Sequence, residues 1–171
     1  AEEVYKYHHL SKIIFIPNFI SPHKTDKIIT SPQHRLRMLD LALEGINHFE
    51  VSDIELKKTD VSFTINTISE LKKIYSDIEL IIGYDNLIEF STWKQPDELI
   101  ELVTLVVMDR KIKSHPQNPD KYFDKAVILD TPQIEISASE IRNRVRNNLP
   151  VNFLVPQKVM EYINSNNLYK E

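Results

Sequence analysis

Cysteine is absent from this sequence of 171 residues, and glycine occurs only at Gly45 and Gly83. Without cysteine, the chain has no disulfide scaffold, no thiol nucleophile, no cysteine-ligated zinc site and no iron–sulfur cluster. Two isolated glycines exclude a glycine-rich loop that would cradle phosphates. No apolar run approaches the roughly 18 residues of a membrane span, and the first residues lack the pattern of a secretion signal. We therefore expect a cytoplasmic protein with no membrane partner.

The charges are nearly balanced, with a small acidic excess. The chain has 21 lysines and arginines against 25 aspartates and glutamates, which gives a net charge of −4 and a pI near 5.9. A general nucleic-acid binder normally carries a basic excess, so we expect no nucleic-acid partner. The length is typical of one domain, and we expect a single domain over residues 1–171.

Apolar residues follow two patterns that alternate along the chain. Short continuous runs rich in β-branched residues predict buried strands, and runs with helical spacing predict amphipathic helices. The expected strands cover residues 12–16, 49–57, 79–83, 103–108 and 126–129, and the expected helices cover residues 32–45, 64–75, 96–102, 139–146 and 156–164. The polar residues 111–121 predict a surface loop. This alternation indicates an α/β domain with a largely parallel sheet.

Ligands bind outside the carboxyl ends of the strands in an open parallel sheet. This rule points to Pro17-Asn18, to Gly83-Tyr84-Asp85 and to Asp109-Arg110. Gly83 would allow a ligand to approach the backbone closely, and the Asp85 carboxylate can accept hydrogen bonds from ribose hydroxyls. The alternative is an ordinary strand-to-helix turn in which Asp85 is the N-cap.

Two segments carry groups suited to phosphate. Ser137 and Glu140 have the spacing of a capping box, and the start of their helix offers free N–H groups, hydroxyls and the guanidinium of Arg142. The alternative is a capped surface helix. His23 and Lys24 follow the first expected strand and suit a phosphate as well, although adjacent charged loop residues are often only solvated.

Trp93 is the only tryptophan, and its ring is either a platform for an aromatic heterocycle or a part of the core. Thr64 is expected at the start of a helix, either as its cap or as a contact to a ligand.

The six histidines show no zinc-site spacing, so we expect no protein-held transition metal and expect His8 and His9 to be solvated. No Ser-His-Asp order and no nucleophile elbow are present, which argues against acyl transfer.

Many of these segments occur together, in the same order, in one family. The segments are Ala1-Glu2-Glu3-Val4, Ile14-Phe15-Ile16-Pro17-Asn18, Ser21-Pro22-His23-Lys24, His34-Arg35-Leu36, Ser52-Asp53-Ile54-Glu55-Leu56, Ser62-Phe63-Thr64-Ile65-Asn66-Thr67, Ile82-Gly83-Tyr84-Asp85, Thr92-Trp93-Lys94, Leu105-Val106-Val107-Met108-Asp109-Arg110, Ile136 to Arg142, and the ending from Leu154 to Tyr169. The chain resembles the bacterial nicotinate-nucleotide adenylyltransferases of the nucleotidylyltransferase superfamily along essentially its whole length. The resemblance implies a Rossmann-like, largely parallel sheet with helices on both faces.

The resemblance also implies a reaction and its partners. The adenylyl group of ATP would pass to nicotinate mononucleotide, giving deamido-NAD and pyrophosphate in NAD (pyridine nucleotide) biosynthesis. Magnesium would arrive with ATP and be held mainly by phosphates and water. A homodimer is one assembly compatible with the resemblance.

Substrate-binding roles follow from the matching positions. By resemblance, His23 and Lys24 belong to the loop that receives the mononucleotide phosphate. Phe63 and Thr64 match a tyrosine–threonine pair that meets the nicotinate carboxylate, and Phe63 lacks the phenol. Trp93 matches the residue that stacks on the pyridine ring.

Nucleotide-binding roles follow in the same way. By resemblance, Gly83 and Asp85 form the adenosine-binding turn. Ser137, Ser139 and Arg142 match the S-S-T-x-I-R signature that holds the ATP phosphates; alanine replaces its second serine here, and Ser139 replaces its threonine.

One family motif has no match in this sequence. The first strand of the family ends in G-G-T-F-D-P-x-H-x-G-H, whose backbone and two histidines hold the transferring phosphate. The chain opens on Ala1-Glu2-Glu3-Val4 without an N-cap, as the interior of the following helix would. We therefore expect the first strand and its motif to lie upstream of Ala1, and we identify no catalytic residue in this chain.

Two other functions remain open at this stage. A phosphopantetheine adenylyltransferase would share the fold, but Thr64, Trp93 and the longer C-terminal region favour the nicotinate enzyme. A non-catalytic nucleotide-binding module would use Asp85 and the helix that starts at Ser137.

Overall fold

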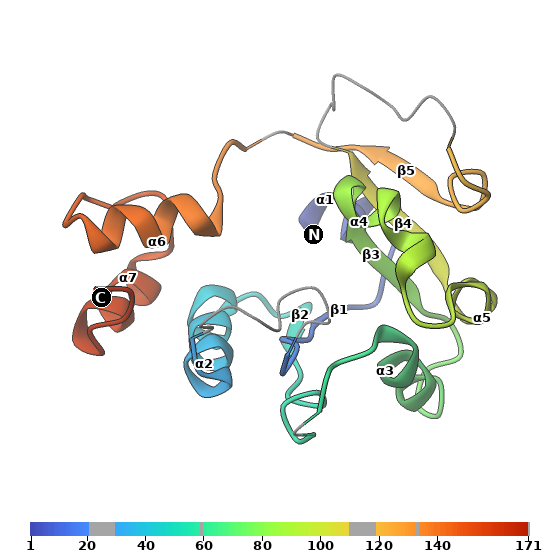
Figure 1. Ribbon diagram of the computed structural model, residues 1–171, viewed down its shortest axis with the longest axis horizontal. Coiled ribbons are helices and arrows are strands. Elements are labelled where there is room, and N and C mark those ends of the chain that lie inside the picture. The colour runs from blue at the N-terminus through green and yellow to red at the C-terminus, as the bar shows by residue number, and fades with distance from the viewer. Residues whose placement is uncertain (21–29, 59, 110–118, 133, 171) are drawn as a thin grey trace. The chain divides into compact units, whose positions relative to one another are not determined.

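Helices and strands alternate along the chain, as expected for an α/β protein. The computed structural model describes residues 1–20, 30–58, 60–109, 119–132 and 134–170 (Figure 1). In chain order these residues form α1 (Glu2–Tyr7), β1 (Ile13–Phe15), α2 (Pro32–Leu43), β2 (Phe49–Val51), α3 (Thr64–Leu71), β3 (Glu79–Gly83), α4 (Tyr84–Ile88), the 3-10 helix η2 (Phe90–Thr92), α5 (Pro96–Leu102), β4 (Thr104–Asp109), β5 (Val127–Asp130), α6 (Ala138–Arg146) and α7 (Gln157–Ser165). None of the described helices is long and apolar enough to cross a membrane.

The chain divides into two compact units. The first comprises Ala1–Leu10, Ile20–Thr25 and Asp60–Gln133, and the second comprises Ser11–Phe19, Asp26–Thr59 and Ile134–Glu171. Each unit has its own parallel sheet and its own apolar cluster. The single domain over residues 1–171 stays a prediction.

The first unit is built on the sheet β3-β4-β5, whose strands are all parallel. Val106 and Val107 on its central strand are fully buried. A continuous apolar run suits such a strand, because both faces of a parallel sheet are covered. α4 follows β3 directly and inserts Tyr84 and Leu87, both fully buried. Leu99 of α5 is fully buried in the same core cluster.

The second unit pairs β1 with β2 in parallel register. The rings of Phe15 and Phe49 meet edge-on, with centroids 5.2 Å apart. Helices α2 and α7 pack together, and His34 Nδ1 lies 2.9 Å from the Tyr162 hydroxyl across that contact. Buried side chains of α6, α7 and the segment between them complete a second apolar cluster around Val145, Val151, Val159 and Ile163.

Local capping signals in the sequence proved reliable. The Ser31 hydroxyl accepts a hydrogen bond from the His34 amide, and proline follows at the first position of α2, where it is favoured. At the other end of α2 the C-cap is Glu44, and Gly45 comes directly after it with φ 85°. This left-handed conformation is the one that favours glycine after a helix.

Two predicted elements end four or more residues earlier than expected. The strand predicted over residues 49–57 ends at Val51, because the following residues form a turn in which the Leu56 amide donates to the Asp53 carbonyl at 2.9 Å. The helix predicted over residues 64–75 ends at Leu71, since the Ile74 amide already bonds the carbonyl three residues back. Most of the predicted loop 111–121 lies outside the described residues.

Candidate functional site

The carboxyl end of β3 carries the first candidate site. Gly83 is the N-cap of α4 with φ −81° and ψ 160°, a conformation open to any residue. A Cβ built there would meet Asn86 Nδ2 and Asp85 Oδ1 at 3.8 Å, which is ordinary contact. The fold therefore does not require glycine at this position. A role for Gly83 in the close approach of a ligand to the backbone stays a prediction.

Asp85 is not the N-cap of α4, so that alternative interpretation is wrong. The helix already begins at Tyr84, whose buried ring anchors the first turn, and Asp85 lies exposed within this turn. A carboxylate at this place is favoured by the helix dipole. It also faces solvent, where it can accept hydrogen bonds from hydroxyl groups of a ligand.

The start of α3 lies in the same unit. Phe63 is its N-cap residue in an extended conformation and makes no side-chain cap, and Thr64 is the first helical residue. The Lys94 ammonium lies over the Phe63 ring, with Nζ 4.6 Å from the ring centroid. Lys94 belongs to the motif Thr92-Trp93-Lys94, but no role was predicted for it. The 31 positions between these two residues exceed any local periodicity that could have revealed the contact.

Trp93 lies at the rim of the core. Its ring is tilted by 33° against Phe90, with centroids 5.1 Å apart, and it packs against the buried cluster that also supports Phe63. The indole Nε1 is buried and has no hydrogen-bond partner among the described residues. The side chain is only partly buried. Part of the ring therefore packs against the core. Its stacking on a pyridine ring stays a prediction.

The second unit carries the predicted phosphate-binding helix, α6. The Ser137 hydroxyl accepts a hydrogen bond of 3.0 Å from the Glu140 amide, which confirms Ser137 as the N-cap. Arg142 Nη2 donates to the Ser139 hydroxyl at 3.0 Å, and both side chains are exposed. A hydroxyl, a guanidinium and the positive end of a helix thus share one turn, which suits an anionic group.

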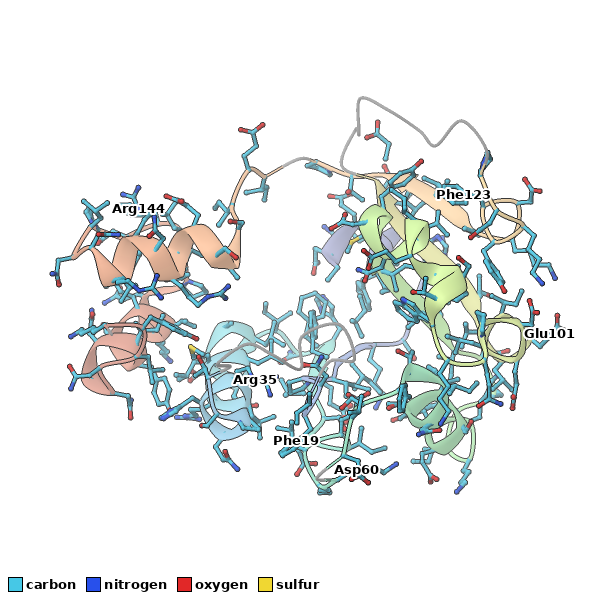
Figure 2. All side chains as sticks on the ribbon, in the orientation of Figure 1. Phe19, Arg35, Asp60, Glu101, Phe123 and Arg144 are labelled. Carbon is cyan, nitrogen blue, oxygen red and sulfur yellow. The ribbon has the colours of Figure 1, made fainter. Side chains whose placement is uncertain are left out.

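Arg35 on α2, for which no role was predicted, binds residues on both sides of the segment 21–29. Its guanidinium donates to the carbonyls of Asn18, Phe19 and Thr30, at 2.6, 2.9 and 3.1 Å. Figure 2 labels Arg35 and Phe19. Desolvation lowers the pKa of the guanidinium, and attraction by Tyr169 raises it by less. His23 and Lys24, the predicted phosphate ligands, lie outside the described residues.

The expectation for His8 is wrong, whereas His9 is exposed as expected. α1 ends at Tyr7, and the next residue turns back so that His8 Nδ1 contacts Glu79 Oε2 of β3 at 2.7 Å. The two side chains are only 15% and 23% exposed. Within the described part of the chain, no group of three or more metal-ligating side chains of His, Asp or Glu type is close enough to hold a metal ion.

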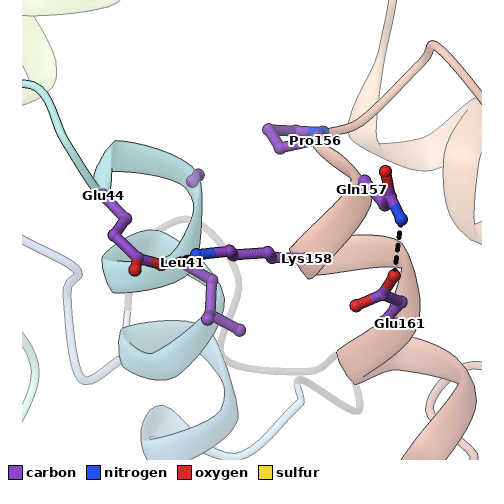
Figure 3. A pocket seen from close by; sticks show the side chains of 7 residues that line it. Leu41, Glu44, Pro156, Gln157, Lys158 and Glu161 are labelled. Atoms are coloured by element: carbon purple, nitrogen blue, oxygen red, sulfur yellow. Dashed lines mark hydrogen bonds and ion pairs between the residues drawn. The ribbon is translucent and has the colours of Figure 1, made fainter.

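A shallow pocket of about 400 Å³ lies between α2 and α7 (Figure 3). It is lined by Leu41, Ala42, Glu44, Pro156, Gln157, Lys158 and Glu161. Glu44 and Lys158 pair with each other across it at 2.7 Å, and Gln157 donates to Glu161 at 2.8 Å. The hydrogen bond from Lys158 lowers the pKa of the Glu44 carboxyl. The polar groups are thus engaged with one another, and no predicted site residue lies here.

Parallel strands alternating with helices, with a glycine and an acidic residue after one strand and a helix start that suits an anion, are typical of nucleotide-binding α/β proteins. The cytidylyltransferase-like family model matches residues 1–144. A protein of Carboxydothermus hydrogenoformans named "Probable nicotinate-nucleotide adenylyltransferase" is 36% identical over 179 residues, covering 99% of this chain and 89% of that protein. A protein of the same name from Borreliella burgdorferi is 37% identical over 171 residues, covering 99% and 86%. The chain belongs to the cytidylyltransferase-like family, within its nicotinate-nucleotide adenylyltransferases.

Solved structures agree on the fold. The nicotinic acid mononucleotide adenylyltransferase of Plasmodium falciparum, in its complex with NaAD, superposes with a TM-score of 0.79 at 17% identity. It covers 98% of this chain and 87% of that one. The same enzyme complexed with APC gives a TM-score of 0.75 at 17% identity, with the same coverage. These likenesses confirm the Rossmann-like nucleotidyltransferase fold.

Proposed function

We propose that this chain transfers the adenylyl group of ATP to nicotinate mononucleotide, forming deamido-NAD and pyrophosphate in NAD biosynthesis. The observation that carries the proposal is 36% identity to a relative of that name over 99% of this chain and 89% of the relative. Similarity of this extent covers the residues around the candidate sites as well as the core. A shared fold alone would not support a substrate.

The reaction requires positioning more than reactive side chains. A phosphate oxygen of the mononucleotide attacks the α-phosphorus of ATP, and a new P–O bond forms there. The bond between this phosphorus and the oxygen that bridges to the β-phosphorus breaks, and pyrophosphate leaves with its electron pair. No protein nucleophile takes part, so the protein contributes orientation and neutralisation of phosphate charge.

We assign the adenosine part of ATP to the turn at Gly83 and Asp85. The place of Gly83 at the carboxyl end of β3 and the exposed carboxylate of Asp85 support this assignment. We assign the ATP phosphates to Ser137, Ser139 and Arg142. The cap at Ser137 and the contact between Ser139 and Arg142 hold these groups at the positive end of α6.

The mononucleotide is assigned to two segments. Trp93, Phe63 and Thr64 would receive the pyridine ring and its substituent, because a partly exposed aromatic ring and the start of a helix suit an aromatic acid. His23 and Lys24 would receive the phosphate of the mononucleotide. Their assignment rests on the matching positions in the sequence.

Magnesium is proposed to enter as the counterion of the ATP phosphates. It would be held mainly by those phosphates and by water. A cytoplasmic location follows from the proposed reaction, because its substrates are intracellular nucleotides. The homodimer stays a prediction.

The test is an assay of pyrophosphate release by protein expressed from the complete reading frame that encodes this chain. ATP and magnesium would be offered with nicotinate mononucleotide, with its amide form or with phosphopantetheine. We expect turnover with the nicotinate form to dominate. Turnover dominated by phosphopantetheine would replace the proposed substrate, and ATP binding without turnover on any acceptor would leave a nucleotide-binding module.

A further inference from the structure

Arg35 holds the side chain of Asn18 as well as its backbone. Arg35 Nη1 carries two hydrogens, and it donates to the Asn18 carbonyl at 2.6 Å and to Asn18 Oδ1 at 3.1 Å. Arg35 Nη2 donates to the Phe19 carbonyl at 2.9 Å, and Nε donates to the Thr30 carbonyl at 3.1 Å. All three nitrogens of the guanidinium are therefore engaged, which holds the group in one orientation.

These contacts determine which way the Asn18 carboxamide faces. A guanidinium carries donors and no acceptor, so the carboxamide must present its oxygen to Arg35, and its NH2 group faces away. The Asn18 side chain is half-buried. Within the described part of the chain, no acceptor binds the NH2 group. The contact with Arg35 thus orients two N–H donors that no described residue uses.

Asn18 lies at a place where parallel sheets bind ligands. β1 ends at Phe15 and pairs in parallel with β2, and Asn18 comes shortly after this strand end. Ligands of open parallel sheets bind outside the carboxyl ends of the strands. The two N–H donors of a carboxamide match the acceptor oxygens of a phosphate. An oriented asparagine at this strand end therefore suits the phosphate of a ligand.

We infer that Arg35 is a positioning residue for the mononucleotide phosphate, because it orients the Asn18 carboxamide that donates to a phosphate oxygen. Arg35 itself does not touch the substrate. The inference rests on the proposed function, which brings this phosphate to the chain after β1. A carboxamide that is already held loses less conformational freedom when the phosphate binds, and this strengthens binding. Without the guanidinium, the carboxamide would rotate and the hydrogen bond to the phosphate would weaken.

Three variants and one matched control test the inference. Arg35→Lys keeps the positive charge but places all donors on one nitrogen, so it cannot hold Asn18 Oδ1 together with the three carbonyls. Asn18→Ala removes the carboxamide, and a double variant combines both changes. Arg37→Lys makes the same exchange on the exposed side of α2 and is the control. Circular dichroism would establish that each variant is folded.

Calorimetric titration gives the first measurement and does not depend on turnover. Binding of nicotinate mononucleotide would be compared with binding of nicotinate riboside, which lacks the phosphate. We expect Arg35→Lys to weaken mononucleotide binding by about tenfold and to leave riboside binding within about twofold. The double variant should bind the mononucleotide no more weakly than Asn18→Ala does, because Arg35 acts through Asn18. Arg37→Lys should bind both compounds as the wild type does.

Steady-state kinetics give the second measurement. In Arg35→Lys, KM for the mononucleotide should rise by about tenfold, whereas kcat and KM for ATP should stay within about twofold. A general loss of structure would change all three constants.

Three results would overturn the inference. They are an unchanged affinity of Arg35→Lys for the mononucleotide, an equal loss of affinity for the riboside, and additive losses in the double variant. Absent turnover in the wild type would overturn the proposed reaction alone, because calorimetry would still measure how far the effect of Arg35 depends on the phosphate.

Discussion

The guanidinium of Arg35 donates a hydrogen bond of 2.6 Å to the main-chain carbonyl of Asn18. Asn18 follows β1, and the same guanidinium reaches the Thr30 carbonyl just before α2 at 3.1 Å. One side chain thus holds the residues before and after the segment that contains His23 and Lys24. The planar guanidinium spreads its donors over a fork that reaches carbonyls on both sides, whereas a lysine ammonium has all its donors on one nitrogen atom.

Replacement of Arg35 by lysine should therefore destabilise the protein although it keeps the charge. We expect the free energy of unfolding to fall by about 2 kcal/mol, because two or more charged hydrogen bonds to carbonyls are lost. Urea denaturation would measure this change. Arg37→Lys, on the exposed side of the same helix, is the control and should change stability by no more than about 0.5 kcal/mol. Equal effects at both positions would contradict the structural role of Arg35.

The two glycines should respond to alanine in opposite ways. Gly45→Ala should cost about 1 kcal/mol of stability, because alanine is strained at its φ of 85°. Its kinetic constants should not change. Gly83→Ala should keep stability within about 1 kcal/mol, because the added Cβ meets only ordinary contacts at 3.8 Å. It should raise KM for ATP several-fold.

Urea denaturation and steady-state kinetics on both glycine variants would separate these outcomes. A stability loss at Gly83 with an unchanged KM for ATP would mean that glycine serves the fold at that position and not the ligand.

Alanine substitutions at Ser137 and Ser139 should distinguish a residue that caps a helix from a residue that contacts the ligand. Ser137→Ala removes the acceptor for the Glu140 amide and should lower the free energy of unfolding by about 1 kcal/mol. Ser139→Ala removes only an exposed contact with Arg142, so stability should hold while KM for ATP rises. Thermal unfolding and ATP titration of the pyrophosphate assay would measure the two effects. An unchanged KM in Ser139→Ala would remove this hydroxyl from the phosphate site.

Acid should weaken the contact between α2 and α7. The hydrogen bond from Lys158 and then its charge lower the pKa of Glu44, so the folded protein holds the proton less tightly than the unfolded chain does. The stabilisation is therefore complete above the ordinary value of about 4.3 and is lost as pH falls through the lowered pKa. We expect the urea midpoint of the wild type to fall more steeply than that of Glu44→Gln between about pH 5 and pH 3.

The comparison with Glu44→Gln isolates this pair from other carboxyls with a lowered pKa, such as Asp53 and Asp97. Both side chains of the pair are more than half exposed, at 58% and 56%, so added salt should reduce the difference. Parallel pH curves for the two proteins would contradict the role of the pair.

Much of the fold was predictable from local sequence. The cap at Ser137 and the strand over residues 79–83 were predicted, because each depends on residues close together in the chain. The strand predicted over residues 49–57 failed at its end, because its last residues form a turn through the contact of Asp53 with Leu56. Apolar residues at similar spacing do not distinguish such a turn from a strand.

The sequence by itself determined the alternation of strands and helices, the helix caps and the family, because these depend on local periodicity and on the order of short motifs. Tertiary structure decided which distant residues meet. It brought Lys94 over Phe63, His8 onto Glu79 and Arg35 onto the chain around Asn18. These contacts join residues 17 to 71 positions apart. They form only when packed elements bring them together, so no local pattern encodes them.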